Sequence, residues 1–188
     1  MREIRRKEEI NKMSKKHVVV EPYNEAWKQD FQNIKIELEE ALGDLALRIE
    51  HVGSTSVEGL AAKPIIDIDV VIENVQILDD MILGLRKIGY THNGNQGIEG
   101  REVFKYQGKG HLRKHHLYVC TKDAAELRRH IGFRDYLRSH PEIVAEYSRI
   151  KIEGAAKYPY DMDGYIAYKS DFIEQIYEEM FRKEIFNE

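Results

Sequence analysis

Residues 65–72 read Ile-Ile-Asp-Ile-Asp-Val-Val-Ile, an apolar run interrupted only by Asp67 and Asp69. Consecutive β-branched residues of this kind are typical of a buried strand. Side chains two positions apart leave the same face of a strand, so the two carboxylates project together from Cα atoms roughly 6.6 Å apart. Two carboxylates in an apolar strand are unfavourable unless a positive group compensates their charge. This strand therefore predicts a sheet that carries a charged site.

A Mg²⁺ ion bridging nucleotide phosphates would compensate both carboxylates, because this ion prefers hard oxygen ligands. Two other interpretations remain open, namely a strand whose aspartates face water and a strand whose aspartates pair with buried arginine or lysine. Ile65 and Val71 lie on the same face as the aspartates and are apolar, which argues against the water-facing strand.

A glycine-serine turn precedes this strand, at the end of an earlier strand predicted over residues 45–52. Gly53 allows a sharp turn that brings peptide N–H groups close to a phosphate, and Ser54 is a good N-cap for a short helix whose positive end favours an anion. Taken alone, residues 53–56 are only a capped turn. Followed by Lys63 and the aspartate strand, however, they indicate a site in which the turn holds a triphosphate and the strand holds a metal ion.

The rest of the chain divides into an α/β part and a helical part. Strands are predicted over residues 17–21, 45–52, 65–72, 102–107 and 115–121, and helices over 25–42, 75–88 and 164–182. From residue 123 onward the pattern is helical, with breaks at Pro141 and Pro159. We expect an α/β fold of the α+β type: a charged extension over residues 1–16, an α/β core over 17–122 and a helical region over 123–188 packed on the core.

Composition limits the classes of partner. The 188-residue chain has a net charge of -4, which argues against specific DNA binding because phosphate neutralisation needs a basic surface. Cys120 is the single cysteine, so no internal disulfide points to an oxidising compartment. No apolar run approaches the roughly 20 residues that span a bilayer, and the charged N-terminal residues lack the apolar segment of a signal peptide. We therefore expect a cytoplasmic protein without a membrane partner.

Two motifs resemble known proteins. Gly53-Ser54, followed after twelve residues by Asp67-Ile68-Asp69, resembles the signature of the nucleotidyltransferase superfold that includes polymerase-β-like enzymes. More closely, residues 50–57 and 60–70 are similar to the GrpB family, which is also found fused to dephospho-CoA kinase in some bacteria. The likeness extends from about residue 17 to residue 180 and includes Arg101, His116, Phe133, Arg134, His140, Tyr147, Lys151, Tyr165, Lys169 and Phe172.

This resemblance implies a nucleotidyltransferase-like mixed sheet with flanking helices and a C-terminal helical bundle, and a Mg²⁺- or Mn²⁺-dependent transfer of a nucleotidyl group from a nucleoside triphosphate such as ATP to an unknown acceptor. In that interpretation Asp67 and Asp69 hold the metal ion and act in catalysis together with His116. The expected nucleotide-binding residues are Gly53, Ser54, Thr55, Ser56, Lys63, Arg101, Arg134 and Lys169.

A third carboxylate, which the superfold usually supplies from a later strand, is missing from residues 114–120. That strand offers His116 and Tyr118, and family members commonly have a histidine at the position of Tyr118. Glu102 is an alternative acidic candidate. His116 is interpreted as a general base or metal ligand, although a strand histidine hydrogen-bonded to a neighbour is the commoner case. A non-catalytic nucleotide- or metabolite-binding module, and an interaction protein whose helical third docks a partner, therefore stay open.

Further basic residues allow two interpretations each. His111, Arg113, Lys114 and His115 form either a phosphate-binding loop or a solvated hairpin tip. Arg134 and Arg138, four residues apart with Asp135 expected on a different side, are either phosphate clamps or members of surface ion pairs.

Overall fold

The computed structural model describes residues 17–186, with backbone only for 183–186, and the extension predicted over residues 1–16 lies outside the described residues. Its centre is a five-stranded mixed sheet in the order β1-β2-β5-β4-β3, in which β2 and β5 are parallel and the other neighbours antiparallel. The strands are β1 (Arg48–Val52), β2 (Ile66–Ile72), β3 (Tyr90–His92), β4 (Arg101–Tyr106) and β5 (His115–Thr121). The helices are α2 (Ala26–Leu42), α3 (Leu78–Lys87), α4 (Ala125–Ser139), α5 (Pro141–Lys157) and α6 (Met162–Phe186), with 3-10 helices at Gly43–Leu45, Ser54–Ser56 and Val75–Ile77. The expected α+β fold is confirmed.

Most predicted elements match the structure to within a few residues; one predicted strand is absent, and one observed strand is missed. The strand predicted over residues 17–21 is wrong, because that segment forms a single antiparallel bridge between Glu21 and Ala62. Pro22 follows at once and has no N–H with which to continue a ladder. The short edge strand β3 was not predicted, since three residues carry too little alternation to be recognised.

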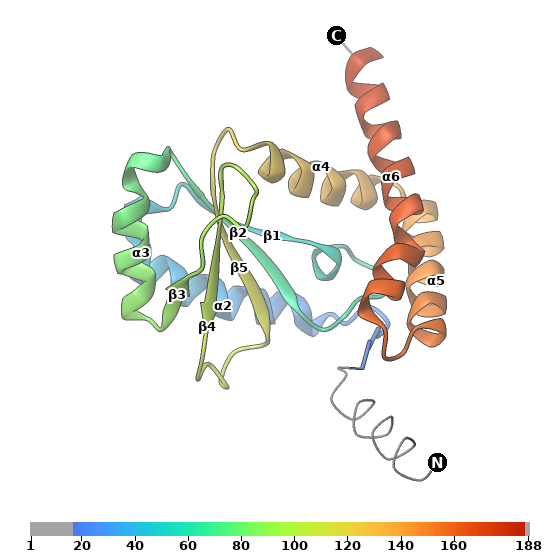
Figure 1. Ribbon diagram of the computed structural model, residues 1–188, viewed down its shortest axis with the longest axis horizontal. Helices are drawn as coiled ribbons and strands as arrows, with labels where there is room; N and C mark the ends of the chain where they lie inside the picture. Colours follow the sequence, from blue (N-terminus) through green and yellow to red (C-terminus); the bar gives the residue numbers. More distant parts are fainter. Residues whose placement is uncertain (1–16, 187–188) are drawn as a thin grey trace, which may run out of the picture.

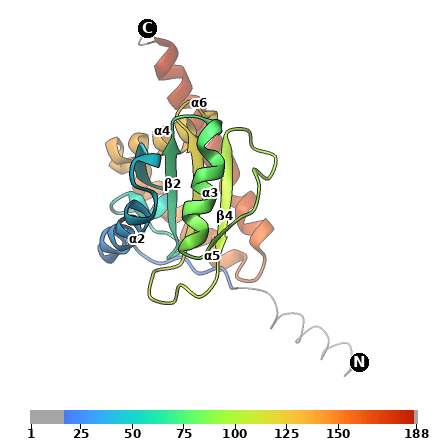
Figure 2. The same ribbon diagram turned by 90° about the vertical axis from the view of Figure 1, so that its left-hand side faces the viewer.

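One face of the sheet carries the main core. Trp27, Ile34 and Leu38 of α2 pack with Ile66 and Ile68 of β2, and all five are fully buried. Burying each of these large apolar side chains contributes about 1.5–3 kcal/mol. Helices α2 and α3 cover this face, as Figures 1 and 2 show from two directions.

The other face of the sheet is covered in two places by the C-terminal helices. Leu127 of α4 packs on Val71 and Cys120, near the C-terminal ends of β2 and β5. Farther along, the helices α4, α5 and α6 pack on the segment that follows the Ser54–Ser56 turn (Figure 1). Val57 and Leu60 of that segment are buried among helical side chains that include Leu137, Val144, Tyr147, Phe172, Ile173 and Ile176. This packing places α5 and α6 over the turn.

Candidate functional site

Strand register brings the two aspartates next to β5. Asp67 lies opposite His116 and Asp69 opposite Tyr118 in the parallel β2–β5 pair. The Oδ1 atom of Asp67 is 2.8 Å from Nδ1 of His116. The sequence-based placement of His116 beside the aspartate strand therefore agrees with the geometry.

Gly53 and Asp67 are in contact across the turn. Gly53 has φ +67° and ψ -174°, a conformation open essentially to glycine alone. A Cβ atom at Gly53 would lie 2.9 Å from both Cβ and Cγ of Asp67. Glycine thus lets the turn approach the carboxylate, and the juxtaposition expected from the two motifs is present.

A cavity of about 270 Å³ lies between this turn and the helices α5 and α6. Three lysines line it together with Ser54, Thr55 and Asp67, and the lining is completed by Ala62, Ile65, His116, Tyr147, Tyr165 and Ile166. Those lysines are Lys63, Lys151 and Lys169.

Lys151 is the most constrained of the three. Its side chain projects from α5, is 3% exposed, and its Nζ donates a hydrogen bond of 2.6 Å to Oγ of Ser54. Burial, reinforced by the charge of Lys169, holds the pKa of Lys151 well below its usual range. Burial also lowers the pKa values of Lys63 and Lys169.

The cavity holds more positive than negative groups. Among the described residues that line it, Asp67 is the one carboxylate, against three lysines. The Tyr165 ring lies 5.9 Å from Nζ of Lys63 and 5.7 Å from Nζ of Lys169, a distance at which the ring attracts both ammonium groups. An anion with several charged oxygens would complement this arrangement.

Asp69 differs from Asp67 in its surroundings. The side chain of Asp69 is fully buried and that of Asp67 is 32% exposed. His130 of α4 binds Asp69, with Nδ1 2.8 Å from Oδ2, and its Nε2 lies 3.3 Å from Glu126. Burial raises the pKa of Asp69 while the His130 hydrogen bond opposes that rise. Burial disfavours charged His130 in turn, but the Asp69 hydrogen bond and charge outweigh it and raise the His130 pKa.

Asp67 and Asp69 are the carboxylates that would hold a divalent cation; Asp67 lines the lysine cavity, whereas the fully buried Asp69 does not. Oδ1 of Asp69 is buried and has no hydrogen-bond partner among the described residues. A cation beside this oxygen would offset the cost of burying it without a partner. Together with Asp67, Asp69 supplies two carboxylates, the usual protein share of a Mg²⁺ site that phosphates complete. Within residues 17–186, no group of three or more His, Cys, Asp or Glu side chains is arranged to hold a metal ion.

Several expected site residues lie elsewhere. Ser56 is buried and its hydroxyl donates to the carbonyl oxygen of Gly53, so it stabilises the turn from within. Arg101 stacks over the Tyr118 ring at 4.8 Å and is 3.8 Å from Glu126. Neither side chain lines the cavity.

The guanidinium group of Arg134 forms its hydrogen bonds within the protein. It donates to Glu50 at 2.7 Å, to the carbonyl oxygen of His51 at 3.1 Å, and to Asp135 at 2.7 Å. Asp135 follows Arg134 directly on α4, and the long arginine side chain folds back onto it. Arg138 donates to the carbonyl oxygen of Ser56.

The loop between β4 and β5 and the alternative carboxylate are also engaged. Arg113 pairs with Asp30 and His111 with Glu37, which tie the loop to α2. Glu102 lies 2.6 Å from Nε2 of His92. It is therefore paired away from Asp67 and Asp69.

Lys151 is the principal residue that the sequence-based site omitted. The sequence does contain a pattern that singles out Lys151. The buried residues of α5 recur at steps of three and four, and they are Val144, Tyr147, Lys151 and Gly154. A lysine among such buried residues needs a partner or a ligand. The turn it contacts is 97 residues away in sequence, so periodicity alone could not identify that partner.

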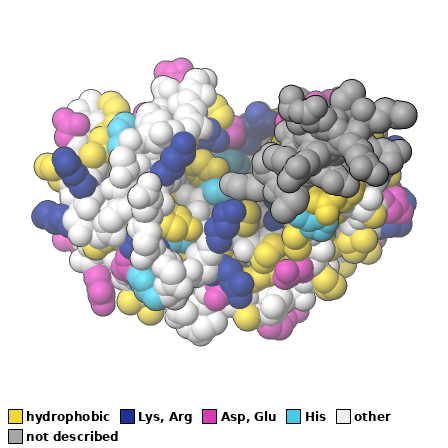
Figure 3. All heavy atoms as spheres, turned by 60° about the horizontal axis from the view of Figure 1, so that its bottom comes forward, with side chains coloured by type: hydrophobic (Ala, Val, Ile, Leu, Met, Phe, Trp, Pro, Cys, Tyr) yellow, Lys and Arg dark blue, Asp and Glu magenta, His cyan; other side chains and the backbone are white. Residues whose placement is uncertain are grey.

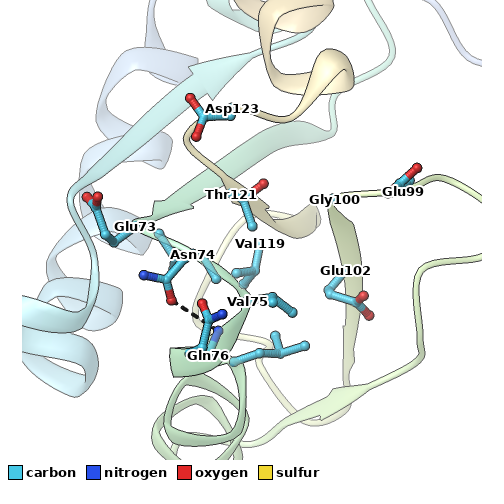
Figure 4. Close-up of a pocket in the computed structure, with 12 residues that line it drawn as sticks. Glu73, Asn74, Val75, Gln76, Glu99, Gly100, Glu102, Val119, Thr121 and Asp123 are labelled. Carbon is cyan, nitrogen blue, oxygen red and sulfur yellow. Dashed lines mark hydrogen bonds between the residues drawn. The ribbon is translucent and has the colours of Figure 1, made fainter.

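A different cavity, of about 430 Å³, lies at the opposite end of β2 and β5 (Figure 4). Its lining, all within the described residues, contains Glu73, Glu99, Glu102 and Asp123 but no lysine or arginine. It therefore suits phosphate poorly, and the lysine cavity remains the candidate site.

Solved structures define the class of fold. The Cid1 poly(U) polymerase bound to MgATP is similar with a TM-score of 0.53 and 12% identity, over 73% of this chain and 44% of that one. Cid1 in complex with the UTP analogue UMPNPP gives a TM-score of 0.51 at 15% identity, over 73% and 43% of the two chains. The chain thus has a nucleotidyltransferase-like fold.

Residues 17–179 match the GrpB protein family, and the chain belongs to that family. The crystal structure of the conserved protein GrpB from Enterococcus faecalis has a TM-score of 0.77 and 36% identity, covering 88% of this chain and 98% of that one. The glutamate-rich protein GrpB of Alkalihalophilus pseudofirmus is 36% identical over 89% of this chain and 98% of its own length.

Other relatives are longer than the matched part. The protein YqkA of Bacillus subtilis is 36% identical over 85% of this chain, which spans only 46% of YqkA. The dephospho-CoA kinase of Mycolicibacterium paratuberculosis is 25% identical over 83% of this chain and 44% of that protein. Among the helices within residues 17–186, none has the length and apolar character needed to cross a bilayer.

Proposed function

We propose that the protein binds a nucleoside triphosphate together with a divalent cation and transfers its nucleotidyl group to an acceptor hydroxyl. The observation that carries this proposal is the convergence of Ser54, Asp67 and three lysines on one cavity of about 270 Å³. The ligands that Cid1 carries by its descriptions, MgATP and a UTP analogue, support a nucleoside triphosphate as the donor.

The triphosphate binds between the turn and the two helices. Lys151 and Lys169 approach it from α5 and α6, and Lys63 approaches from the segment before β2. The Ser54 hydroxyl, which Lys151 holds at 2.6 Å, offers a further hydrogen bond to a phosphate oxygen. A cation held by Asp67 and Asp69 would supply neutralisation of phosphate charge during transfer.

His116 accepts the proton of the acceptor. When Nδ1 of His116 donates to Asp67, Nε2 carries a lone pair and is the basic atom. The acceptor oxygen forms a bond to the α-phosphorus, the bond from that phosphorus to the pyrophosphate oxygen breaks, and the hydroxyl proton moves to Nε2. Pyrophosphate is the leaving group.

A non-catalytic nucleotide-binding module is the second candidate. It is favoured by Tyr118, which stands opposite Asp69 where a third carboxylate would serve catalysis. Binding of a triphosphate without pyrophosphate release from any acceptor would distinguish this module from the enzyme.

Calorimetry with a non-hydrolysable ATP analogue and Mg²⁺ tests the proposed site. Asp67→Asn should weaken Mg²⁺-dependent binding at least about tenfold, equivalent to 1.4 kcal/mol. Glu73→Gln is the matched control, since Glu73 is a carboxylate after the other end of β2, paired with Lys122. Equal affinity of wild type and Asp67→Asn would exclude the site. Release of pyrophosphate from ATP in a metabolite extract tests the transfer itself.

A further inference from the structure

A groove of about 770 Å³ adjoins the lysine cavity on the same side of the sheet. The two hollows share one lining residue, His116, which holds Asp67 by its hydrogen bond. Besides His116, the lining includes Arg101, Val103, Lys105, Lys114 and Tyr118. The imidazole therefore stands between the proposed donor cavity and a second space.

Strand register explains why the groove continues from the aspartates. Asp69 is opposite Tyr118, and Tyr118 is opposite Val103 of β4. Directly opposed side chains share a face of the sheet, and Lys105 shares the face of Val103 because it lies two positions along β4. One face of β2, β5 and β4 thus runs from Asp67 across His116 to Lys105.

The charge of this groove is opposite to that of the whole chain. Among the described residues that line it there are Arg101, Lys105 and Lys114 and no carboxylate, although Arg101 lies 3.8 Å from Glu126 outside the groove; the whole chain has a net charge of -4. Lys105 and Lys114 are exposed, and neither forms an ion pair with another described residue. In Figure 3, which brings the lower side of Figure 1 forward, Lys, Arg and His side chains lie among hydrophobic ones. Unpaired lysines in a hollow favour an anionic ligand.

Size and charge favour a small molecule over a polynucleotide. The groove volume of about 770 Å³ falls within the ordinary range for small-molecule sites. A polynucleotide needs an extended basic surface, which a pI near 6.1 and two exposed lysines do not supply. Tyr118 is half-buried and adds apolar surface to the groove, and Arg101 lies over its ring at 4.8 Å.

We propose that this groove is the acceptor site and that it takes a small phosphate-bearing molecule of nucleoside monophosphate size, with its phosphate bound by Lys105 and Lys114 and its hydroxyl beside His116. This inference rests on the proposed function, because it supplies the second substrate of the same transfer. The donor cavity and the acceptor groove then meet at the His116–Asp67 pair.

Calorimetry with AMP as the probe tests the groove, using the full chain saturated with Mg²⁺ and a non-hydrolysable ATP analogue. Wild type should bind AMP in addition to the analogue. The double variant Lys105→Glu, Lys114→Glu should weaken AMP binding at least about tenfold and leave the affinity for the analogue within about twofold. Lys122→Glu is the control, since Lys122 is an exposed lysine just beyond the other end of β5, and it should change neither affinity.

Three results would overturn the acceptor groove: no AMP binding to wild type, AMP binding that the double variant retains, or competition between AMP and the analogue for one site. Binding of a short oligonucleotide without binding of AMP would also overturn it. The proposed donor site fails separately, if the analogue does not bind wild type. If the analogue does not bind but AMP still binds and requires Lys105 and Lys114, the groove is supported as a phosphate site and only the donor site is excluded.

Discussion

Gly53 and Asp67 leave no space for a side chain between them: a Cβ atom at Gly53 would lie 2.9 Å from Cγ of Asp67. The contact joins the turn that carries Ser54 to the strand that carries both aspartates. Since the turn and the strand are the two parts proposed to hold phosphate and cation, their separation is fixed by this glycine.

Gly53→Ala should therefore lower both stability and ligand binding. The left-handed φ of +67° costs a non-glycine residue about 1–3 kcal/mol, and the overlap with Asp67 must also be relieved by a shift of the turn or of the carboxylate. We expect weaker Mg²⁺-dependent binding of an ATP analogue by calorimetry and a lower free energy of unfolding in urea.

Gly94→Ala provides the comparison. Gly94 has φ +69°, and no atom lies within 4 Å of the position its Cβ would occupy. The Gly94→Ala variant should be less stable only because of its strained backbone conformation, and it should keep its affinity for the analogue. Equal effects of the two substitutions on affinity would mean that the approach of turn and carboxylate is unimportant for binding.

Lys151→Met should stabilise the protein at pH 7 and weaken triphosphate binding. Because burial lowers the Lys151 pKa in the folded chain below its unfolded value, the unfolded chain binds more protons between those two pKa values. The wild-type free energy of unfolding therefore rises with pH in that window, and methionine removes the dependence. The stability advantage of the variant should shrink as the pH approaches the unfolded lysine pKa.

Urea unfolding at several pH values, with calorimetry at pH 7, measures both effects. Lys157→Met is the control, because Lys157 lies on the same helix but is exposed. A variant that is less stable than wild type at pH 7 and binds the analogue equally well would mean that Lys151 serves packing.

The sequence could identify the parts of the site that are local. Gly53, Ser54 and the aspartate strand are separated by few residues, and strand alternation already places Asp67 and Asp69 on one face. The bounds of β5 follow from its own apolar residues, and β5 is the strand that brings His116 to Asp67.

The remaining parts depend on contacts between distant segments. Lys151 reaches Ser54 only because α5 packs on Val57 and Leu60, and helical periodicity does not say which turn a helix will cover. Arg134 was expected at a phosphate for the same reason: a basic side chain looks alike whether its partner is a ligand or Glu50, 84 residues away.

His130→Ala should destabilise the protein by about 3 kcal/mol, since it leaves the fully buried carboxylate of Asp69 without its partner. Asp69 raises the His130 pKa, so the charged part of this stabilisation is complete below the unfolded histidine pKa and is lost as the pH rises through the folded value. The loss on substitution should therefore be larger at pH 6 than at pH 9, by urea unfolding.

A double-mutant cycle with Asp69→Asn separates pairing from packing. Adding Asp69→Asn to His130→Ala should recover part of the lost stability, because the unpaired charge is then removed. His116→Ala is the control, since His116 is 48% exposed and its partner Asp67 is 32% exposed, and it should cost less than about 1 kcal/mol. Full additivity of the two substitutions would exclude a coupled pair.

Arg134→Met separates the two roles that an arginine near a phosphate site can have. Arg134 is 11% exposed, and its removal leaves Glu50, which is 22% exposed, and the carbonyl oxygen of His51 without their donor. We expect a loss of about 2–4 kcal/mol in urea unfolding, toward the lower end of the range for a broken buried pair because Glu50 retains some solvent. Affinity for the ATP analogue should stay within about twofold.

Arg149→Met is the control, because it removes an exposed i,i+4 ion pair and should change the free energy of unfolding by less than about 0.5 kcal/mol. Weakened analogue binding by Arg134→Met at unchanged stability would instead assign Arg134 to the phosphates.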